Sequence, residues 1–260
     1  MPELLDALLI DLAAEGSAVD ALVTDLDARA WRRPTPAEGW TIAHQIAHLK
    51  WTDHAAYLAA TSPEAFAAEL VKAAEDPENY VNAGADEGAA LAADELLTTW
   101  REGRRELAEA LRALPPGTKT PWYGPPMSPA SVATGRLMET WAHGQDIADA
   151  LGVRREPTAR LRHIAHLGVR TRAYGYLVHG EQPPDGEVRV ELVAPDGSLW
   201  TWGPEDSPDR VSGPALDFCL LVTQRRHRDD LALRATGTAD HWLDVAQTFA
   251  GPPGSGRKPA

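Results

Sequence analysis

The chain of 260 residues is long enough for one large domain or two ordinary ones. Its hydrophobic content of 43% and charged content of 24% are typical of globular proteins, which excludes general disorder and fibrous or collagen-like sequences. The single cysteine, Cys219, excludes an internal disulfide framework and a cysteine-based zinc cluster.

The charge is strongly acidic, with 38 Asp and Glu residues against 25 Lys and Arg residues and a formal net charge of −13. A field of this sign repels phosphate backbones and anionic membranes, so we expect neither nucleic acid nor a membrane as a partner. Nearly all basic residues are arginines, whose guanidinium forks suit carboxylates and phosphates. This favours a small anionic ligand, although GC-rich coding is the simpler explanation of the arginine content.

Two further observations concern location. The longest apolar runs, such as residues 218–222, are far shorter than the roughly 20 residues that span a bilayer. The first six residues lack the basic region of a secretory signal. We therefore expect a cytoplasmic protein, and the sequence leaves both a monomer and a homodimer open.

The first half of the chain predicts helices. Apolar residues recur there at the 3.6-residue period of an amphipathic helix. The predicted helices cover residues 4–26, a second stretch after Thr41, residues 62–74, residues 87–114, and a last stretch from Ser128 or Ser131 to Leu151. Residues 75–86 are expected to be irregular, and residues 118–129, with four prolines, to form a loop. Four long antiparallel helices with such loops predict a four-helix bundle.

The pattern changes after Pro157, where helices and strands alternate. We expect a helix at 159–178, a strand around 188–192, a hairpin turn at Asp196-Gly197 with a returning strand, a helix at 214–226, a short strand at 231–234 and a last helix at 239–249. The predicted fold class is therefore mainly α with a smaller α+β part. The predicted domains are a bundle at residues 1–155, an α+β domain at 156–250 and a flexible tail at 251–260.

Two predicted helical segments carry residues that could perform chemistry, at 39–48 and at 136–146. In the second segment Glu139 and His143 are four residues apart, so they lie one turn apart on one helical face. At this spacing one helix can offer two ligands to one ion. A third ligand from a facing helix would complete a site with an open position, as in catalytic zinc sites, and His48 is the candidate.

The spacing alone does not decide for a metal site. An ion pair on the helix surface, or a buried histidine satisfied by hydrogen bonds, is a more frequent outcome of the same pattern. His44 and His48 also form a competing pair with the same spacing. From the residues alone, both interpretations stay open.

The same residues resemble the DinB-like four-helix metalloprotein superfamily and, within it, the mycothiol-dependent maleylpyruvate isomerase family. In that family a Gly-Trp-(Thr/Ser) sequence leads into the second helix, which carries a histidine, and a (Glu/His)xxxHxxD element lies on the fourth. The matching positions here are Gly39-Trp40-Thr41, His48, Glu139, His143 and Asp146. The resemblance implies an N-terminal DinB-like four-helix bundle with His48, Glu139 and His143 as metal ligands, and a C-terminal α+β domain. The segment 242–254 resembles a metal-binding subgroup.

The resemblance also implies cofactors. The metal would be a divalent cation, with Zn²⁺ the first choice and Ni²⁺, Fe²⁺ or Mn²⁺ suited to the same ligands, and mycothiol would be a thiol cofactor. The implied function is a metal-dependent isomerase or thiol transferase that acts on a small, anionic substrate. A thiol-independent lyase, hydrolase or cyclase is one alternative, and a non-catalytic metal-binding or ligand-binding module is another.

Further residues are candidates for supporting roles. Asp146, one turn beyond His143, could orient a ligand imidazole or be an ordinary surface acid. Arg136, one turn before Glu139, could hold that carboxylate or a substrate anion, or be solvated. For Arg225 and Arg226, at the end of a predicted helix, the resemblance implies contact with the thiol cofactor or a substrate carboxylate, although the helix dipole alone favours cations there. Cys219, in an apolar stretch, is expected to be an inert buried thiol.

Overall fold

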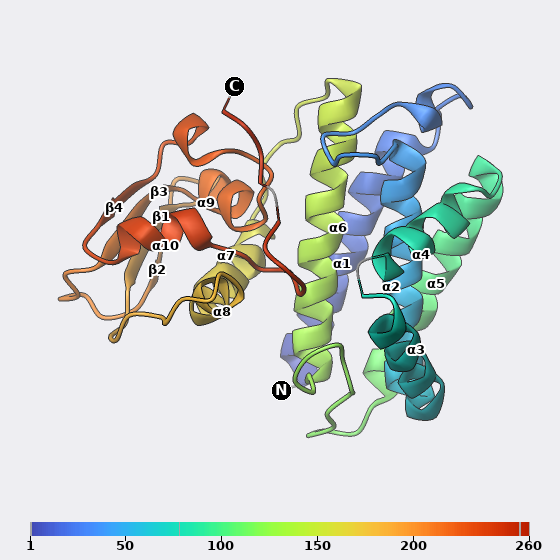
Figure 1. The fold of residues 1–260 in the computed structure, drawn as a ribbon, viewed down its shortest axis with the longest axis horizontal. Coiled ribbons are helices and arrows are strands. Elements are labelled where there is room, and N and C mark those ends of the chain that lie inside the picture. The colour runs from blue at the N-terminus through green and yellow to red at the C-terminus, as the bar shows by residue number, and fades with distance from the viewer. Residues whose placement is uncertain (1, 78, 255, 260) are drawn as a thin grey trace. The chain divides into compact units, whose positions relative to one another are not determined.

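The computed structural model describes residues 2–77, 79–254 and 256–259, and the chain divides into two compact units, Met1–Arg154 and Arg155–Ala260. The described residues form ten α-helices, two short 3₁₀ helices and one four-stranded sheet (Figure 1). This confirms the predicted fold class, mainly α with a smaller α+β part. In the described part of the chain, no helix is long and apolar enough to cross a bilayer.

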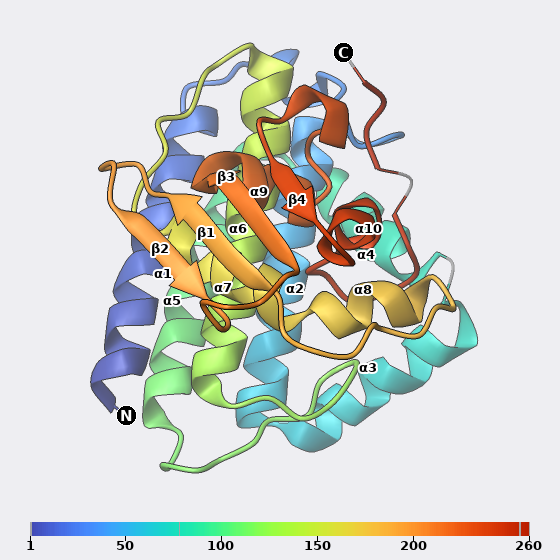
Figure 2. The ribbon, with the colours of Figure 1, turned by 90° about the vertical axis from the view of Figure 1, so that its left-hand side faces the viewer.

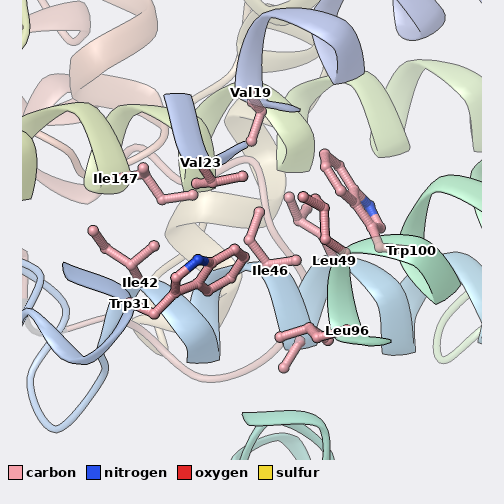
Figure 3. Packing of buried hydrophobic residues seen from close by; sticks show 11 residues of the cluster. Val19, Val23, Trp31, Ile42, Ile46, Leu49, Leu96, Trp100 and Ile147 are labelled. Atoms are coloured by element: carbon pink, nitrogen blue, oxygen red, sulfur yellow. The ribbon is translucent and has the colours of Figure 1, made fainter. Parts of the chain in front are cut away.

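The first unit is built around four long helices. They are α1 (Pro2–Val23), α2 (Ile42–Thr61), α5 (Ala93–Ala113) and α6 (Pro129–Leu151). Helix α1 packs on α6, helix α2 packs on α5, and α2 also contacts α6 (Figure 1). Val19, Ile46, Trp100 and Ile147, one from each of these helices, are almost fully buried in a single cluster (Figure 3). The predicted four-helix bundle is thus the frame of this unit.

Local signals set the beginnings of the two helices that matter most for the site. At the start of α6, the Ser128 hydroxyl accepts a hydrogen bond from the backbone N–H of Ser131 at 3.1 Å, so Ser128 is the N-cap. At the start of α2, the backbone N–H of Thr41 donates to Nδ1 of His44 at 3.2 Å. The other ring nitrogen of His44 lies 3.0 Å from Oδ1 of Asp86. His44 therefore has a structural role at the helix start.

Helix α4 (Tyr80–Ala89) lies where the sequence predicted an irregular segment, and it ends before α5 begins, so the predicted single helix at 87–114 is wrong at its start. Two glycines in α4 explain why the sequence hides this helix and how the helix packs on α2. A Cβ at Gly84 would come within 2.8 Å of the Trp51 ring, and one at Gly88 within 2.7 Å of the Ala47 side chain. Glycine lowers helix propensity, which hides the helix in the sequence, but it lets α4 pack closely on α2.

The second unit contains α7 (Leu161–Arg170), α8 (Arg172–Val178), α9 (Ala215–Val222), α10 (Ala239–Val245) and the sheet. Its strands are β1 (Arg189–Val193), β2 (Leu199–Trp202), β3 (Arg210–Pro214) and β4 (Arg234–Thr236). Their order is β2-β1-β3-β4, with β1 and β3 parallel and both outer pairs antiparallel (Figure 2). Val190, Leu192 and Val211 are completely buried, which gives the sheet its apolar face.

Several predictions for this unit need correction. The helix predicted at 159–178 is two helices, broken at Thr171. Strand β3 was missed because its sequence, Arg-Val-Ser-Gly-Pro, has one large apolar residue and therefore no visible alternation. The predicted strand at 231–234 begins only at Arg234, and the last helix ends at Val245. Element boundaries are the feature that single-sequence periodicity reports least well.

Candidate metal centre

Three side chains from two helices meet inside the first unit. His48 comes from α2, and Glu139 and His143 come from α6. Each offers one ligand atom, and these atoms all lie within 4.8 Å of one another. Oε2 of Glu139 is 3.1 Å from Nε2 of His143 and 3.6 Å from Nε2 of His48. The three residues predicted as ligands are thus brought together, with both imidazoles directed at one carboxylate.

The environment keeps this carboxylate charged. Burial alone would raise the pKa of Glu139, but hydrogen bonds from His143 and His48, together with their charge, lower the pKa well below its usual value. The two histidine side chains are only 10% exposed and that of Glu139 is 21% exposed. An ionised carboxylate is the form that can ligate a cation.

The donor set fits a divalent cation. Two imidazole nitrogens and one carboxylate oxygen form the ligand combination found in several catalytic zinc sites, and it also suits other first-row metals. In addition, Nδ1 of His48 is buried and has no hydrogen-bond partner among the described residues. Three protein ligands would leave at least one coordination position for a substrate or water.

Gln45 holds one of the imidazoles in place. Its Oε1 lies 2.5 Å from Nδ1 of His143, and its Nε2 donates to the Thr35 hydroxyl at 2.8 Å. Because the amide oxygen accepts, Nδ1 of His143 carries a proton. A cation bound to the site would take the place of the proton that Nε2 donates to Glu139, and Nε2 would then present its lone pair to the cation. The sequence analysis missed Gln45 and offered Asp146 for this role. The available signal was the position of Gln45 one turn before His48 on α2.

Aromatic rings surround the histidines. The Trp40 ring lies 5.2 Å from the His48 ring and 5.9 Å from the His143 ring, measured between centroids. The centroid of the Trp51 ring lies 6.0 Å from that of His48 and 5.0 Å from that of Tyr80. Such apolar walls lower the local dielectric constant and strengthen the interaction between the carboxylate and any cation.

Arg136 is deeply buried, which contradicts the interpretation as a solvated arginine. Its Nε donates to Oδ1 of Asp53 on α2 at 2.8 Å, and the two side chains are 3% and 5% exposed. A buried guanidinium requires a carboxylate partner, and Asp53 is that partner here. The structure therefore gives Arg136 a different carboxylate from the predicted Glu139.

The remaining predicted residues lie in defined places. Asp146 is 1% exposed on α6, one turn beyond His143. Arg225 and Arg226 follow α9 in the second unit, where their Nη1 atoms donate to the backbone oxygens of Thr223 and Arg225. Their catalytic and cofactor-binding roles stay predictions.

Cys219 is an inert thiol, as expected. It is completely buried in α9, burial raises the pKa of its thiol, and Sγ contacts the backbone oxygen of Leu161 at 3.4 Å. A thiol in this setting stays protonated at neutral pH and is a poor nucleophile. Any thiol chemistry of this protein therefore requires a thiol from outside the chain.

With this geometry in view, comparisons with known proteins become informative. A family model described as the mycothiol maleylpyruvate isomerase N-terminal domain matches residues 12–148, just over half of the chain, including all three residues of the candidate centre. The chain belongs to this family. The predicted family is thereby confirmed. A second model, described as wyosine base formation, matches residues 184–236 of this family member, the segment that contains its four strands.

Individual proteins are also similar to this chain. Proteins of two Mycobacterium tuberculosis strains, both described as uncharacterized, are 56% identical to this family member over 248 residues, 95% of this chain and 96% of theirs. Among solved structures, the mycothiol-dependent maleylpyruvate isomerase matches with a TM-score of 0.59 at 17% sequence identity over 96% of both chains. A histidine-to-alanine mutant of that enzyme matches equally well. At this identity the structural match shows a shared fold.

The buried ion pair predicts a large stability effect. Replacing Asp53 with Ala leaves the Arg136 guanidinium buried without its carboxylate, which should lower the free energy of unfolding by about 3–5 kcal/mol. Urea unfolding followed by circular dichroism measures the change. Asp6→Ala is the matched control, because it removes a largely exposed ion pair with Arg112 and should cost less than about 0.5 kcal/mol. Equal losses in both variants would contradict this account.

Proposed function

We propose that this protein is a metal-dependent enzyme that works with a low-molecular-weight thiol, either isomerising a small unsaturated acid or transferring the thiol to it. One observation carries the proposal: His48, Glu139 and His143 converge on one point within the family's N-terminal domain. Further support comes from the enzyme that shares the fold, a mycothiol-dependent maleylpyruvate isomerase. The cofactors proposed are a divalent cation, with Zn²⁺ first, and mycothiol.

The proposed centre has a clear division of roles. When bound, a divalent cation would supply a Lewis acid able to polarise a carbonyl oxygen or to favour the thiolate form of a thiol. Glu139 contributes the negative charge, and the imidazoles of His48 and His143 contribute neutral nitrogen ligands. Gln45 holds a proton on Nδ1 of His143, so that Nε2 would be the nitrogen that meets a bound cation.

The rings of Trp40 and Trp51 protect the centre from water. With water excluded, a nucleophilic thiolate keeps its reactivity and a polarised carbonyl is not hydrated. Since Cys219 is buried and protonated, the thiol is expected to come from the cofactor. The aromatic walls also favour a planar, conjugated substrate over a saturated one.

Anionic groups of the substrate or thiol cofactor need cationic partners. We propose Arg225 and Arg226 for this role, following the resemblance to the family. Asp146 and Arg136 are proposed to support the α6 ligands, with Arg136 acting through its pair with Asp53. The substrate class that fits these charges is a small carboxylic acid with an adjacent carbon–carbon double bond or carbonyl group.

The first test is metal content. The purified wild-type protein should carry about one divalent cation per chain, and the double variant His48→Ala, His143→Ala should carry less than a tenth of that, because two of three ligands are lost. Inductively coupled plasma mass spectrometry measures both. His54→Ala is the control, because His54 is an exposed histidine on the same helix. Full metal retention in the double variant would remove the proposed centre.

The second test addresses Gln45. Replacing Gln45 with Ala removes the hydrogen bond to Nδ1 of His143, and the affinity for Zn²⁺ should fall by about 10- to 100-fold. Competition with a chromophoric chelator gives the dissociation constant. Gln145→Ala is the matched control, since Gln145 lies on α6 and contacts Asp149 instead of a candidate ligand. If both variants bind Zn²⁺ equally well, Gln45 has no part in the centre.

The third test separates thiol-dependent from thiol-independent chemistry. With metal-loaded protein and maleylpyruvate, isomerisation should require mycothiol and should be lost in the His48→Ala, His143→Ala variant. Loss of the maleylpyruvate absorbance follows the reaction, and chromatography identifies the product. Turnover that is equal with and without mycothiol would support a thiol-independent Lewis-acid enzyme. Metal binding with no turnover and no calorimetric signal from mycothiol would support a non-catalytic module.

A further inference from the structure

A cavity lies in the first unit, in the seam between α1 and α5. Its volume is about 360 Å³, within the range of small-molecule sites. Leu9 and Leu12 from α1 and Leu107 from α5 form apolar walls, and Asp53 and Thr140 reach it from the two other long helices. Of the residues that the structure describes, the three candidate metal ligands are not among its lining. The cavity is therefore separate from the site discussed above.

The polar side of this cavity has hydrogen-bond donors without acceptors. Trp100 and Arg104 both line it. Nε1 of Trp100 and Nη1 of Arg104 are buried, and neither has a hydrogen-bond partner within the described part of the chain. The Trp100 side chain is 1% exposed and belongs to the bundle core (Figure 3). Buried donors are almost always paired, so two orphaned donors at one cavity indicate an acceptor that the chain does not itself supply.

The Arg104 guanidinium is held in position before any ligand arrives. Its Nη2 donates to Oδ2 of Asp20 at 2.8 Å, and its guanidinium carbon lies 4.5 Å from the centre of the Trp100 ring. Gly16 leaves room for the Arg104 guanidinium, since a Cβ at Gly16 would come within 2.5 Å of Nη1 of Arg104. Burial lowers the pKa of Arg104, although the carboxylates of Asp20 and Asp53 oppose that shift. A fixed, desolvated guanidinium is a good anion receptor.

We propose that this cavity binds a small monocarboxylate. Its carboxylate would accept hydrogen bonds from Nη1 of Arg104 and Nε1 of Trp100, and its hydrocarbon part would lie along Leu9, Leu12 and Leu107. Both orphaned atoms are donors, so the ligand has to offer acceptors, and a carboxylate offers one oxygen to each of them. A single negative charge is favoured over two, since the charged lining residues are three arginines (Arg104, Arg105 and Arg112) and two carboxylates (Asp53 and Glu109).

Calorimetric titration of the full-length, metal-free protein with hexanoate tests the proposal. Hexanoate should bind, and hexanamide, which has the same shape without the charge, should bind at least tenfold more weakly. Arg104→Gln should weaken hexanoate binding at least tenfold. Arg101→Gln is the matched control and should change it less than threefold, because Arg101 also pairs with Asp20 but does not line the cavity.

Two further variants make the result decisive. Ala108→Leu fills the cavity from α5 without touching the Asp20 network, so it should abolish binding even if Arg104→Gln folds poorly. The double variant His48→Ala, His143→Ala should bind hexanoate as the wild type does. Loss of binding in that variant would place the carboxylate at the metal centre instead and overturn the proposal. No binding by the wild type, equal binding of hexanamide, or unchanged binding by Ala108→Leu would overturn it as well.

Discussion

The first unit depends on a column of polar contacts that joins α2 to α6 through the interior of the bundle. Because the helices are antiparallel, positions that ascend on α2 meet positions that descend on α6. The pairs are, in order, Gln45 with His143, His48 with Glu139, and Asp53 with Arg136. At a rise of 1.5 Å per residue, the column extends over about 12 Å of α2. One longitudinal alignment of the two helices satisfies all three pairs.

This column fixes the alignment of α2 and α6, which the apolar core alone leaves undetermined. Leucine, isoleucine and valine side chains pack acceptably in several alignments, and cores tolerate exchange among them. A shift of one helical turn, by contrast, would leave a charged guanidinium and a carboxylate buried without partners, at a cost of several kcal/mol. The polar pairs thus fix the alignment of α2 and α6, and that alignment is what places His48 opposite Glu139. The candidate centre and the rigidity of its frame come from the same contacts.

The sequence predicted the part of this arrangement that lies within single helices. The four-residue spacing of Glu139 and His143 defines a shared face on α6, and the resemblance to the family supplied His48. Gln45 and Asp53 could not be recognised, because their partners lie about 80 to 100 positions away and the pairing requires the helix alignment. Arg136 was assigned to Glu139 for the same reason, since only its own helix was visible. Helix α4 was hidden by glycines whose value lies in contact with α2.

The two ends of the column differ in the chemistry that their side chains allow. At the Asp53–Arg136 end, a cation and an anion neutralise each other at 2.8 Å. At the other end, two imidazole nitrogens face one carboxylate that would be better neutralised by a cation than by a shared proton. Gln45 prevents His143 from turning away to another partner. We therefore expect the chemistry at the end that holds Glu139, and we propose Arg136 as a positioning residue that keeps α6 in register.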